Sequence, residues 1–119
     1  MCFSNWITFD GIAANVPATS GLFQIKVREG LLTYPQGKSA MFYYGLAVNL
    51  SRGLQKFRHE ILPLLEINED ALLIRWLLVE DIPTRFQNHL NAFLANFGTM
   101  PLGNEMLLHK RNQSSPPPD

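Results

Sequence analysis

The chain has 119 residues, 46% of them hydrophobic and 17% charged, and its ten Lys and Arg balance ten Asp and Glu. This length suits one domain with one core, and the composition excludes a wholly disordered chain. A net charge of zero excludes a general attraction to nucleic acid or to an anionic membrane, so such binding requires a local basic patch.

The sequence also bears on the cellular compartment. The single cysteine, Cys2, excludes an internal disulfide and fits a reducing environment. The longest apolar run, residues 71–79, is interrupted by Arg75 and is too short to span a bilayer. The N-terminus has no basic stretch followed by an apolar one, the pattern of a secretory signal. We therefore expect a cytoplasmic protein that does not bind membranes.

The first half of the chain predicts two strands after a lead-in over residues 1–16. Residues 22–27 alternate apolar and polar side chains, which is typical of a half-buried strand. Residues 30–40 are rich in turn-forming residues and are expected to be an irregular connection. A short aromatic strand follows over residues 41–44, and Gly45 is expected to end it.

The second half begins with helical spacing of the apolar residues. This spacing predicts an amphipathic helix over roughly 47–60, started by Ala47 or Asn49 and stopped by Pro63. Residues 72–79 are too short and too apolar for a surface helix. They predict a strand that is buried on both faces and lies at the centre of the sheet.

A second helix is expected from about Thr84 to Gly98, which occupies the usual C-terminal position. Its apolar face is predicted to be Phe86, Leu90, Phe93, Leu94 and Phe97. Residues 109–119, rich in Pro and Ser, are expected to form a disordered tail. Residues 17–108 would then form the single domain.

Two short motifs and their spacing resemble a known family. The triplets 21–23 (Gly-Leu-Phe) and 43–45 (Tyr-Tyr-Gly) resemble the signature strands of the GIY-YIG nucleases. Residues 76–81 look like the third strand of that family, and residues 97–104 resemble the end of many members. The resemblance covers roughly residues 17–105 and implies an α/β (α+β) fold, with a small three-stranded antiparallel sheet flanked by helices.

The resemblance also implies phosphodiester hydrolysis. In the family a Tyr helps to activate water, an Arg on the first helix stabilises the phosphate, and a Glu on the later helix holds a divalent metal. In this chain the matching positions hold Phe23 in the first motif, Gly53 for the Arg and Leu90 for the Glu. Tyr43 and Asn104 are retained. A leucine cannot supply the oxygen ligand that Mg²⁺ requires.

The remaining groups do not restore the pattern. Arg52 lies one residue early, which rotates its side chain by about 100° around a helix. Residues 84–100 contain no carboxylate, His89 alone is a poor Mg²⁺ site, and Glu80 is a remote substitute. We therefore expect an inactive module without a metal or other cofactor, which binds a protein partner or a nucleic-acid backbone. The alternatives are a divergent Mg²⁺-dependent endonuclease that uses Tyr43 and Arg52 on DNA, and an unrelated small α/β domain.

Basic residues of the first helix are the candidates for nucleic-acid contact. Together with the retained amide they are Arg52, Lys56, Arg58, His59 and Asn104. Three of them, Arg52, Lys56 and His59, share one helical face by their spacing. This face either contacts phosphates or is a solvated surface balanced by Glu60 and Glu66.

Several other side chains have a structural and a functional interpretation. The aromatic strand could stack on bases, but aromatic strands more often form core. Arg75, inside an apolar strand, is expected to extend to solvent or to pair with Glu66 or Glu80. Gly53, in mid-helix, costs about 1 kcal/mol relative to Ala and is expected to allow a close packing contact. His89 and His109 are expected on the surface.

Overall fold

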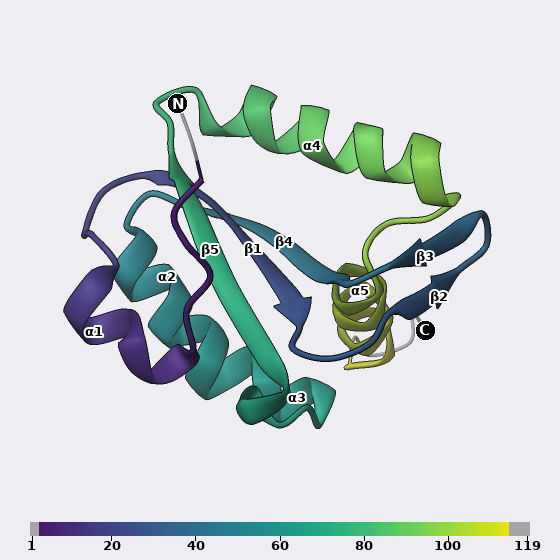
Figure 1. Ribbon diagram of the computed structural model, residues 1–119, viewed down its shortest axis with the longest axis horizontal. Coiled ribbons are helices and arrows are strands. Elements are labelled where there is room, and N and C mark those ends of the chain that lie inside the picture. Colours follow the sequence, from purple (N-terminus) through teal and green to yellow (C-terminus); the bar gives the residue numbers. More distant parts are fainter. Residues whose placement is uncertain (1–2, 115–119) are drawn as a thin grey trace, which may run out of the picture.

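The computed structural model describes residues 3–114, and its centre is a three-stranded antiparallel sheet (Figure 1). The strands are β1 (Gly21–Val27), β4 (Met41–Ala47) and β5 (Leu72–Leu78), in the spatial order β4-β1-β5. β1 pairs with both neighbours, so that Gln24 lies opposite Tyr44 on one side and opposite Arg75 on the other. The expected α+β fold with a three-stranded antiparallel sheet is confirmed.

Helical segments surround the sheet, and a two-stranded hairpin extends from it (Figure 1). The helical segments are η1 (Phe9–Gly11), α1 (Ile12–Asn15), α2 (Leu50–Lys56), the π-helical segment η2 (Phe57–Ile61), α3 (Leu62–Leu65), η3 (Glu69–Ala71), α4 (Ile82–Phe97) and α5 (Leu102–Ser114). The hairpin consists of β2 (Leu32–Tyr34) and β3 (Gly37–Ser39). The prediction that residues 30–40 form an irregular connection is therefore wrong. Strands of three residues are too short to show an alternating pattern, so the sequence does not reveal them.

Different helices cover the two faces of the sheet (Figure 1). On the face that we call the α2 face, Phe23 and Ile74 pack with η1, α1, α2 and α3 in the main apolar core. On the opposite face, the α4 face, Leu22 and Leu77 pack with the first turn of α4. Tyr44 packs further along the same helix. The sheet therefore separates a large core from a smaller one.

Asn49 starts the first long helical stretch, as the sequence predicts. Its side-chain oxygen accepts a hydrogen bond from the N–H of Arg52 at 3.0 Å, which is the usual role of an N-cap. The stretch does not stop at Pro63 but continues to Leu65. Proline lacks an N–H and its ring clashes with the carbonyl four residues earlier, so the wider π-helical turn of η2 accommodates it.

The prediction that residues 72–79 form a central strand buried on both faces is wrong, because β5 lies at an edge of the sheet and several of its residues are only partly buried or exposed. The N-terminal segment covers the outer side of this strand. Ser4 donates its N–H to the carbonyl of Trp76 at 2.8 Å, and Ile7 forms an isolated bridge with Ile74. An apolar strand can thus be an edge strand when another segment of the chain protects it.

Gly45 does not end its strand, since β4 continues to Ala47. Gly45 lies opposite Phe23, and a Cβ at this glycine would be 2.1 Å from Cζ of that ring. The Phe23 ring therefore covers the glycine, an arrangement in which an aromatic side chain compensates for a glycine in a strand.

The long helix α4 begins at Ile82, two residues before the predicted Thr84. Pro83 lies in its first turn, where the missing N–H leaves no helical hydrogen bond unmade. The helix ends at Gly98, whose φ of 83° is left-handed, as predicted. Leu94, expected on the buried face, is instead 47% exposed.

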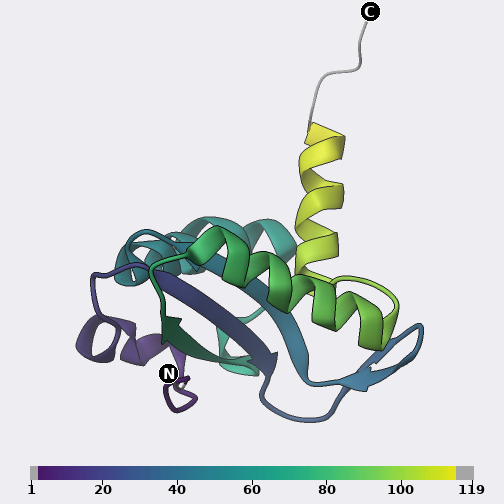
Figure 2. The ribbon, with the colours of Figure 1, turned by 90° about the horizontal axis from the view of Figure 1, so that it is seen from above.

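The last helix, α5, runs away from α4 and from the sheet (Figure 2). Its first turn packs closely on Phe42, because a Cβ at Gly103 would lie 2.8 Å from Cε2 of that ring. Residues 109–114, expected in the tail, belong to this helix, whereas residues 115–119 lie outside the described part of the chain. No helix among the described residues is both long and apolar enough to cross a membrane.

Candidate functional site

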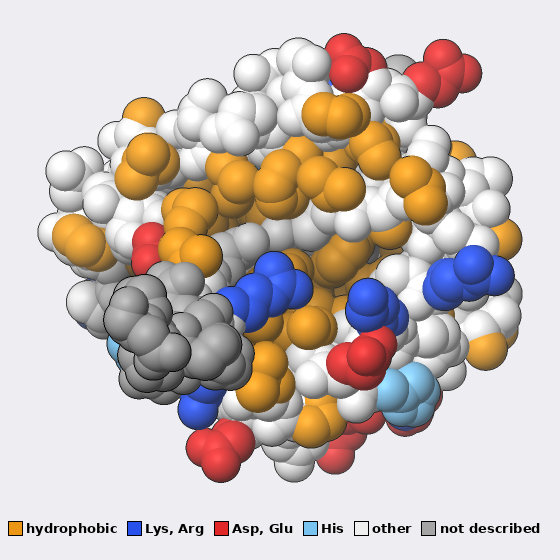
Figure 3. All heavy atoms as spheres, turned by 180° about the vertical axis from the view of Figure 1, so that it is seen from behind, with side chains coloured by type: hydrophobic (Ala, Val, Ile, Leu, Met, Phe, Trp, Pro, Cys, Tyr) orange, Lys and Arg blue, Asp and Glu red, His pale blue; other side chains and the backbone are white. Residues whose placement is uncertain are grey.

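A groove runs along the exposed side of β4, between α4 and α5, with a cavity of about 320 Å³. Its lining residues are Tyr43, Tyr44, Gly45, Leu46, Phe86, Leu90, Met100, Asn104, Leu107, Leu108 and Arg111. Figure 3 faces this side of the molecule and shows apolar side chains gathered along a hollow. Among these lining residues, Arg111 is the only one with a charged side chain.

The groove brings together three positions to which the family resemblance gives a role: Tyr43, Leu90 and Asn104. The basic candidates of the first helix do not line it; these are Arg52, Lys56, Arg58 and His59. The lining contains no carboxylate, so its donor set does not fit Mg²⁺, which prefers hard oxygen ligands. Within the described residues, no three His, Cys, Asp or Glu side chains are close enough to hold a metal ion.

Asn104 closes part of the free edge of β4. Its Oδ1 accepts the N–H of Tyr44 at 2.9 Å, and its Nδ2 donates to the carbonyl of the same residue at 2.9 Å. The side-chain amide thus makes the two hydrogen bonds that a neighbouring strand would make. The Asn104 side chain, predicted to contact nucleic acid, therefore uses both its oxygen and its nitrogen to bind the backbone of β4.

Tyr43 lies between the groove and the main core. Its ring centroid is 4.6 Å from that of Phe57 and 6.0 Å from that of Phe23. Burial raises the pKa of the Tyr43 hydroxyl, and the positive charge of Arg111 only partly opposes this effect. A phenol that keeps its proton at neutral pH is a weak base, so the environment of Tyr43 does not favour the activation of water.

The helix α2 places Gly53 and Arg52 in different surroundings. A Cβ at Gly53 would lie 2.7 Å from Cβ of Ala47, which is closer than real contacts. The predicted packing role of this glycine is therefore confirmed, and the position where the family carries its Arg has no room for a side chain without a shift. Arg52 is exposed on the outer side of the helix.

The basic patch of the first helix is smaller than the sequence indicates, because Arg58 has acidic partners. Its Nη2 lies 2.8 Å from Oδ1 of Asp10 and 2.9 Å from Oε2 of Glu69, and these contacts raise the pKa of Arg58. The pairs connect η1 and η3 to η2. Lys56 and His59 are exposed and remain available to a ligand together with Arg52.

Arg111 is a groove residue that the sequence analysis missed. It comes from the last turns of α5, which the sequence predicts to be a tail, and it is close enough to affect the pKa of Tyr43. A cluster of three basic residues, His109 to Arg111, was the only local signal. It identifies a basic segment but not its place beside β4.

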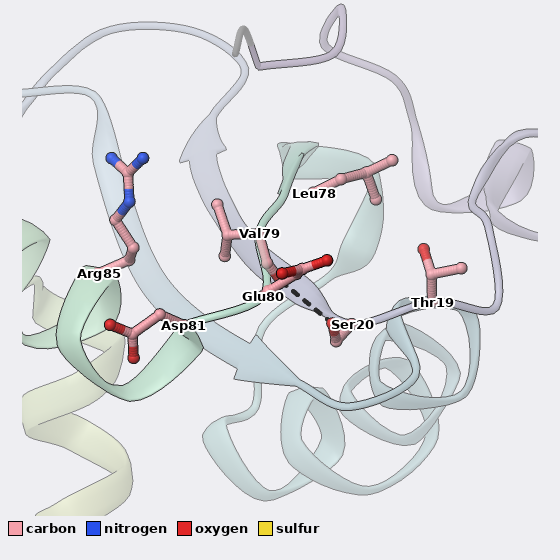
Figure 4. Close-up of a pocket in the computed structure, with 7 residues that line it drawn as sticks. All are labelled: Thr19, Ser20, Leu78, Val79, Glu80, Asp81 and Arg85. Atoms are coloured by element: carbon pink, nitrogen blue, oxygen red, sulfur yellow. Dashed lines mark hydrogen bonds between the residues drawn. The ribbon is translucent and has the colours of Figure 1, made fainter.

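A larger cavity, of about 710 Å³, lies between the end of β5 and the first turn of α4. Figure 4 shows its lining: Thr19, Ser20, Leu78, Val79, Glu80, Asp81 and Arg85. Ser20 donates its hydroxyl to the carbonyl of Val79 at 3.0 Å and fixes one wall. Glu80, considered as a substitute carboxylate, faces this cavity and not the groove that contains Tyr43.

Arg75 pairs with neither Glu66 nor Glu80. Its guanidinium donates from Nε and Nη2 to Oε1 of Gln24 at 2.9 and 2.6 Å. The rings of Phe3 and Trp6 lie 4.2 and 4.5 Å from its Cζ. Cation–π contact and a neutral amide therefore replace the expected ion pair.

No family model, curated protein or solved structure matches the chain. The fold is accordingly defined by its own topology, a three-stranded antiparallel sheet between α1–α3 and α4.

Proposed function

We propose that this chain is a GIY-YIG-like domain that acts by binding a protein segment in the groove beside β4, and not by hydrolysis. The observation that carries the proposal is the chemistry of the groove. It contains Tyr43, Leu90 and Asn104, three positions to which the resemblance gives a role, but an apolar side chain stands where the metal ligand would be. Such a lining favours an apolar partner over a phosphodiester.

The edge of β4 defines the form of that partner. Backbone groups of alternate residues point to the same side of a strand, so those of Leu46 point outward like those of Tyr44. Asn104 hydrogen-bonds the outward backbone groups of Tyr44. No described residue hydrogen-bonds those of Leu46, and the side chain of Leu46 is 43% exposed. An extended peptide with apolar side chains can pair there and place those side chains against Leu90 and Leu108.

A selection from a displayed peptide library tests the proposal. We expect peptides that bind the wild type and lose at least tenfold in affinity to Leu46→Asp and Leu108→Asp. The control is Leu64→Asp, because Leu64 is 45% exposed on α3, similar to Leu108 at 48%, and lies outside the groove. N-methylation of alternate peptide residues is expected to abolish binding. Equal binding to all the variants would refute the groove as the site.

A divergent nuclease is the second candidate, and the observation that favours it is Arg111. A guanidinium beside Tyr43 could take the phosphate-binding role that Gly53 cannot fill. This candidate requires metal-dependent cleavage that Arg111→Ala or Arg52→Ala removes, with a carboxylate supplied from outside the groove.

A further inference from the structure

A row of polar residues crosses the centre of the α4 face. Tyr44, Gln24 and Arg75 lie side by side on β4, β1 and β5, and His89 of α4 lies above Tyr44 with its ring centroid at 6.5 Å. Gln24 is only 5% exposed and is the one polar residue in the buried class among the described residues. Polar groups are costly to bury, and apolar packing does not explain Gln24 and Arg75 at the centre of this row.

Arg75 brings a positive charge without a counter-ion. Its partners are the amide oxygen of Gln24 and the rings of Phe3 and Trp6, all of them neutral. No acidic side chain of the described residues forms an ion pair with Arg75 within 4.0 Å. Burial lowers the pKa of Arg75, which is the direction expected for a cation partly removed from water.

The Gln24 amide has an unused donor. Its oxygen faces Arg75 on β5, and since the amide nitrogen diverges from the same carbon, Nε2 faces the side of β4. No described residue accepts a hydrogen bond from Nε2, and no fully buried side-chain nitrogen or oxygen lacks a partner. Nε2 therefore reaches solvent, and it does so in a cavity of about 180 Å³ that Gln24 lines.

The other walls of this cavity supply further polar groups and two aromatic rings. Tyr44, His89 and Asn96 carry the polar groups, and Phe93 and Phe97 supply rings. Burial lowers the pKa of His89, and the charges of Arg85 and Arg75 lower it further, so the cavity has a positive potential. Hydrogen-bond donors in a positive potential favour an anion with oxygen acceptors.

We propose that the cavity between Gln24, Tyr44 and His89 binds a carboxylate attached to a small apolar or aromatic group. The carboxylate accepts the Nε2–H of Gln24, and the apolar group lies against Phe93 and Phe97. Arg75, hydrogen-bonded to the far side of the Gln24 amide, attracts the carboxylate through its electric field. This site shares Tyr44 with the groove, but its other lining residues differ, and it does not depend on the function proposed for the groove.

Titration of the isotope-labelled protein with benzoate, followed by NMR, tests the site at constant ionic strength. We expect saturable shifts of the Gln24 side-chain amide and of the His89 and Tyr44 signals. Benzamide, which has the same shape without the charge, is expected to bind at least tenfold more weakly. N-acetylphenylalanine distinguishes the source of the ligand, because tighter binding than benzoate indicates the carboxyl end of a peptide.

Two variants and one control test whether binding depends on Gln24 and Arg75. Gln24→Glu gives Arg75 a carboxylate within the protein, so we expect a folded protein that no longer binds benzoate. Arg75→Met is expected to lose at least tenfold in affinity, whereas Lys56→Met, which removes an exposed cation on α2, is expected to leave binding unchanged. Shifts that do not saturate, or binding that survives Gln24→Glu, would overturn the proposal.

Discussion

The two faces of the sheet place different chemistry on the same strands. On the α2 face, Phe23, Ile25 and Ile74 are buried in an apolar core beneath α1, α2 and α3. On the α4 face, the next residues along β1 and β5, Gln24 and Arg75, are polar and share hydrogen bonds. Apolar burial stabilises a fold, whereas a buried polar pair contributes little net stability. The comparison teaches that the α2 face carries the larger apolar core, whereas the α4 face combines two smaller apolar clusters with the polar pair at its centre.

The largest expected difference is between adjacent residues of β5. Ile74 is fully buried on the α2 face, and Ile74→Ala is expected to lower the free energy of unfolding by about 2–5 kcal/mol. Leu73 is only partly buried on the other face, and Leu73→Ala is expected to cost about 1 kcal/mol. Urea denaturation of both variants measures the two losses. Equal losses would contradict the division of labour between the faces.

The polar pair sharpens the comparison. Gln24→Leu removes the acceptor of Arg75 and is expected to cost about 1–3 kcal/mol, since a charged donor then loses its partner. In the double variant Gln24→Leu/Arg75→Met, both partners are apolar, and stability is expected to return close to that of the wild type. A double-mutant cycle by thermal denaturation checks this recovery. A double variant less stable than either single variant would show that the Gln24–Arg75 pair stabilises the fold.

A smaller effect is expected where α2 meets β4. Gly53→Ala gains about 1 kcal/mol of helix propensity but forces a Cβ to within 2.7 Å of Ala47, and overpacking of this kind costs about 1–3 kcal/mol. We expect a net loss of about 1 kcal/mol in chemical denaturation. Ala47→Gly removes the Cβ that the new alanine side chain would approach. The double variant Gly53→Ala/Ala47→Gly is therefore expected to lose less stability than the sum of the two single losses. Additive effects would argue against the close approach.

The smallest expected effect is on the pH dependence of stability. The pKa of His89 is lowered in the folded protein by burial and by Arg85 and Arg75, and Tyr44 faces the same imidazole from the sheet. The unfolded chain therefore binds the proton more readily, and stability falls as the pH drops through about 6.5, the ordinary pKa of histidine. His89→Gln is expected to reduce this loss of stability, measured as the change in melting temperature from pH 7.5 to pH 5.5, about one unit on either side of 6.5. His59→Gln, at an exposed histidine, is the control and is expected to retain it.

The sequence predicts the individual helices and strands of this fold better than it predicts which strands lie side by side. The strand near residues 22–27, the Asn49 cap and the Gly98 end come from local signals, and the structure confirms them. The predicted half-burial of that strand is wrong, because β1 is the central strand and residues 21–25 are buried on both faces. The position of β5 at an edge depends on Ser4 and Ile7, which are far from it in the chain, so its apolar run alone is misleading. Strand order is a property of tertiary pairing, and no local pattern encodes it.

The candidate sites were predictable to a similar extent. The motif spacing relates Tyr43, Leu90 and Asn104, and the structure places them in one groove. Arg111 joins that groove from a helix that the polar composition conceals, and Gln24 meets Arg75 only through the pairing of β1 with β5. Long-range contacts of this kind appear once the strands are in register.

The proposal that the domain binds and does not cut is tested most directly by nicking of supercoiled plasmid DNA in Mg²⁺ or Mn²⁺. The wild type is compared with Tyr43→Phe, Arg52→Ala and Arg111→Ala, each checked for folding by circular dichroism. We predict that the folded wild type nicks no faster than the variants or the buffer, with either metal. Metal-dependent nicking that Tyr43→Phe and either arginine variant abolish would contradict the account and identify an active nuclease.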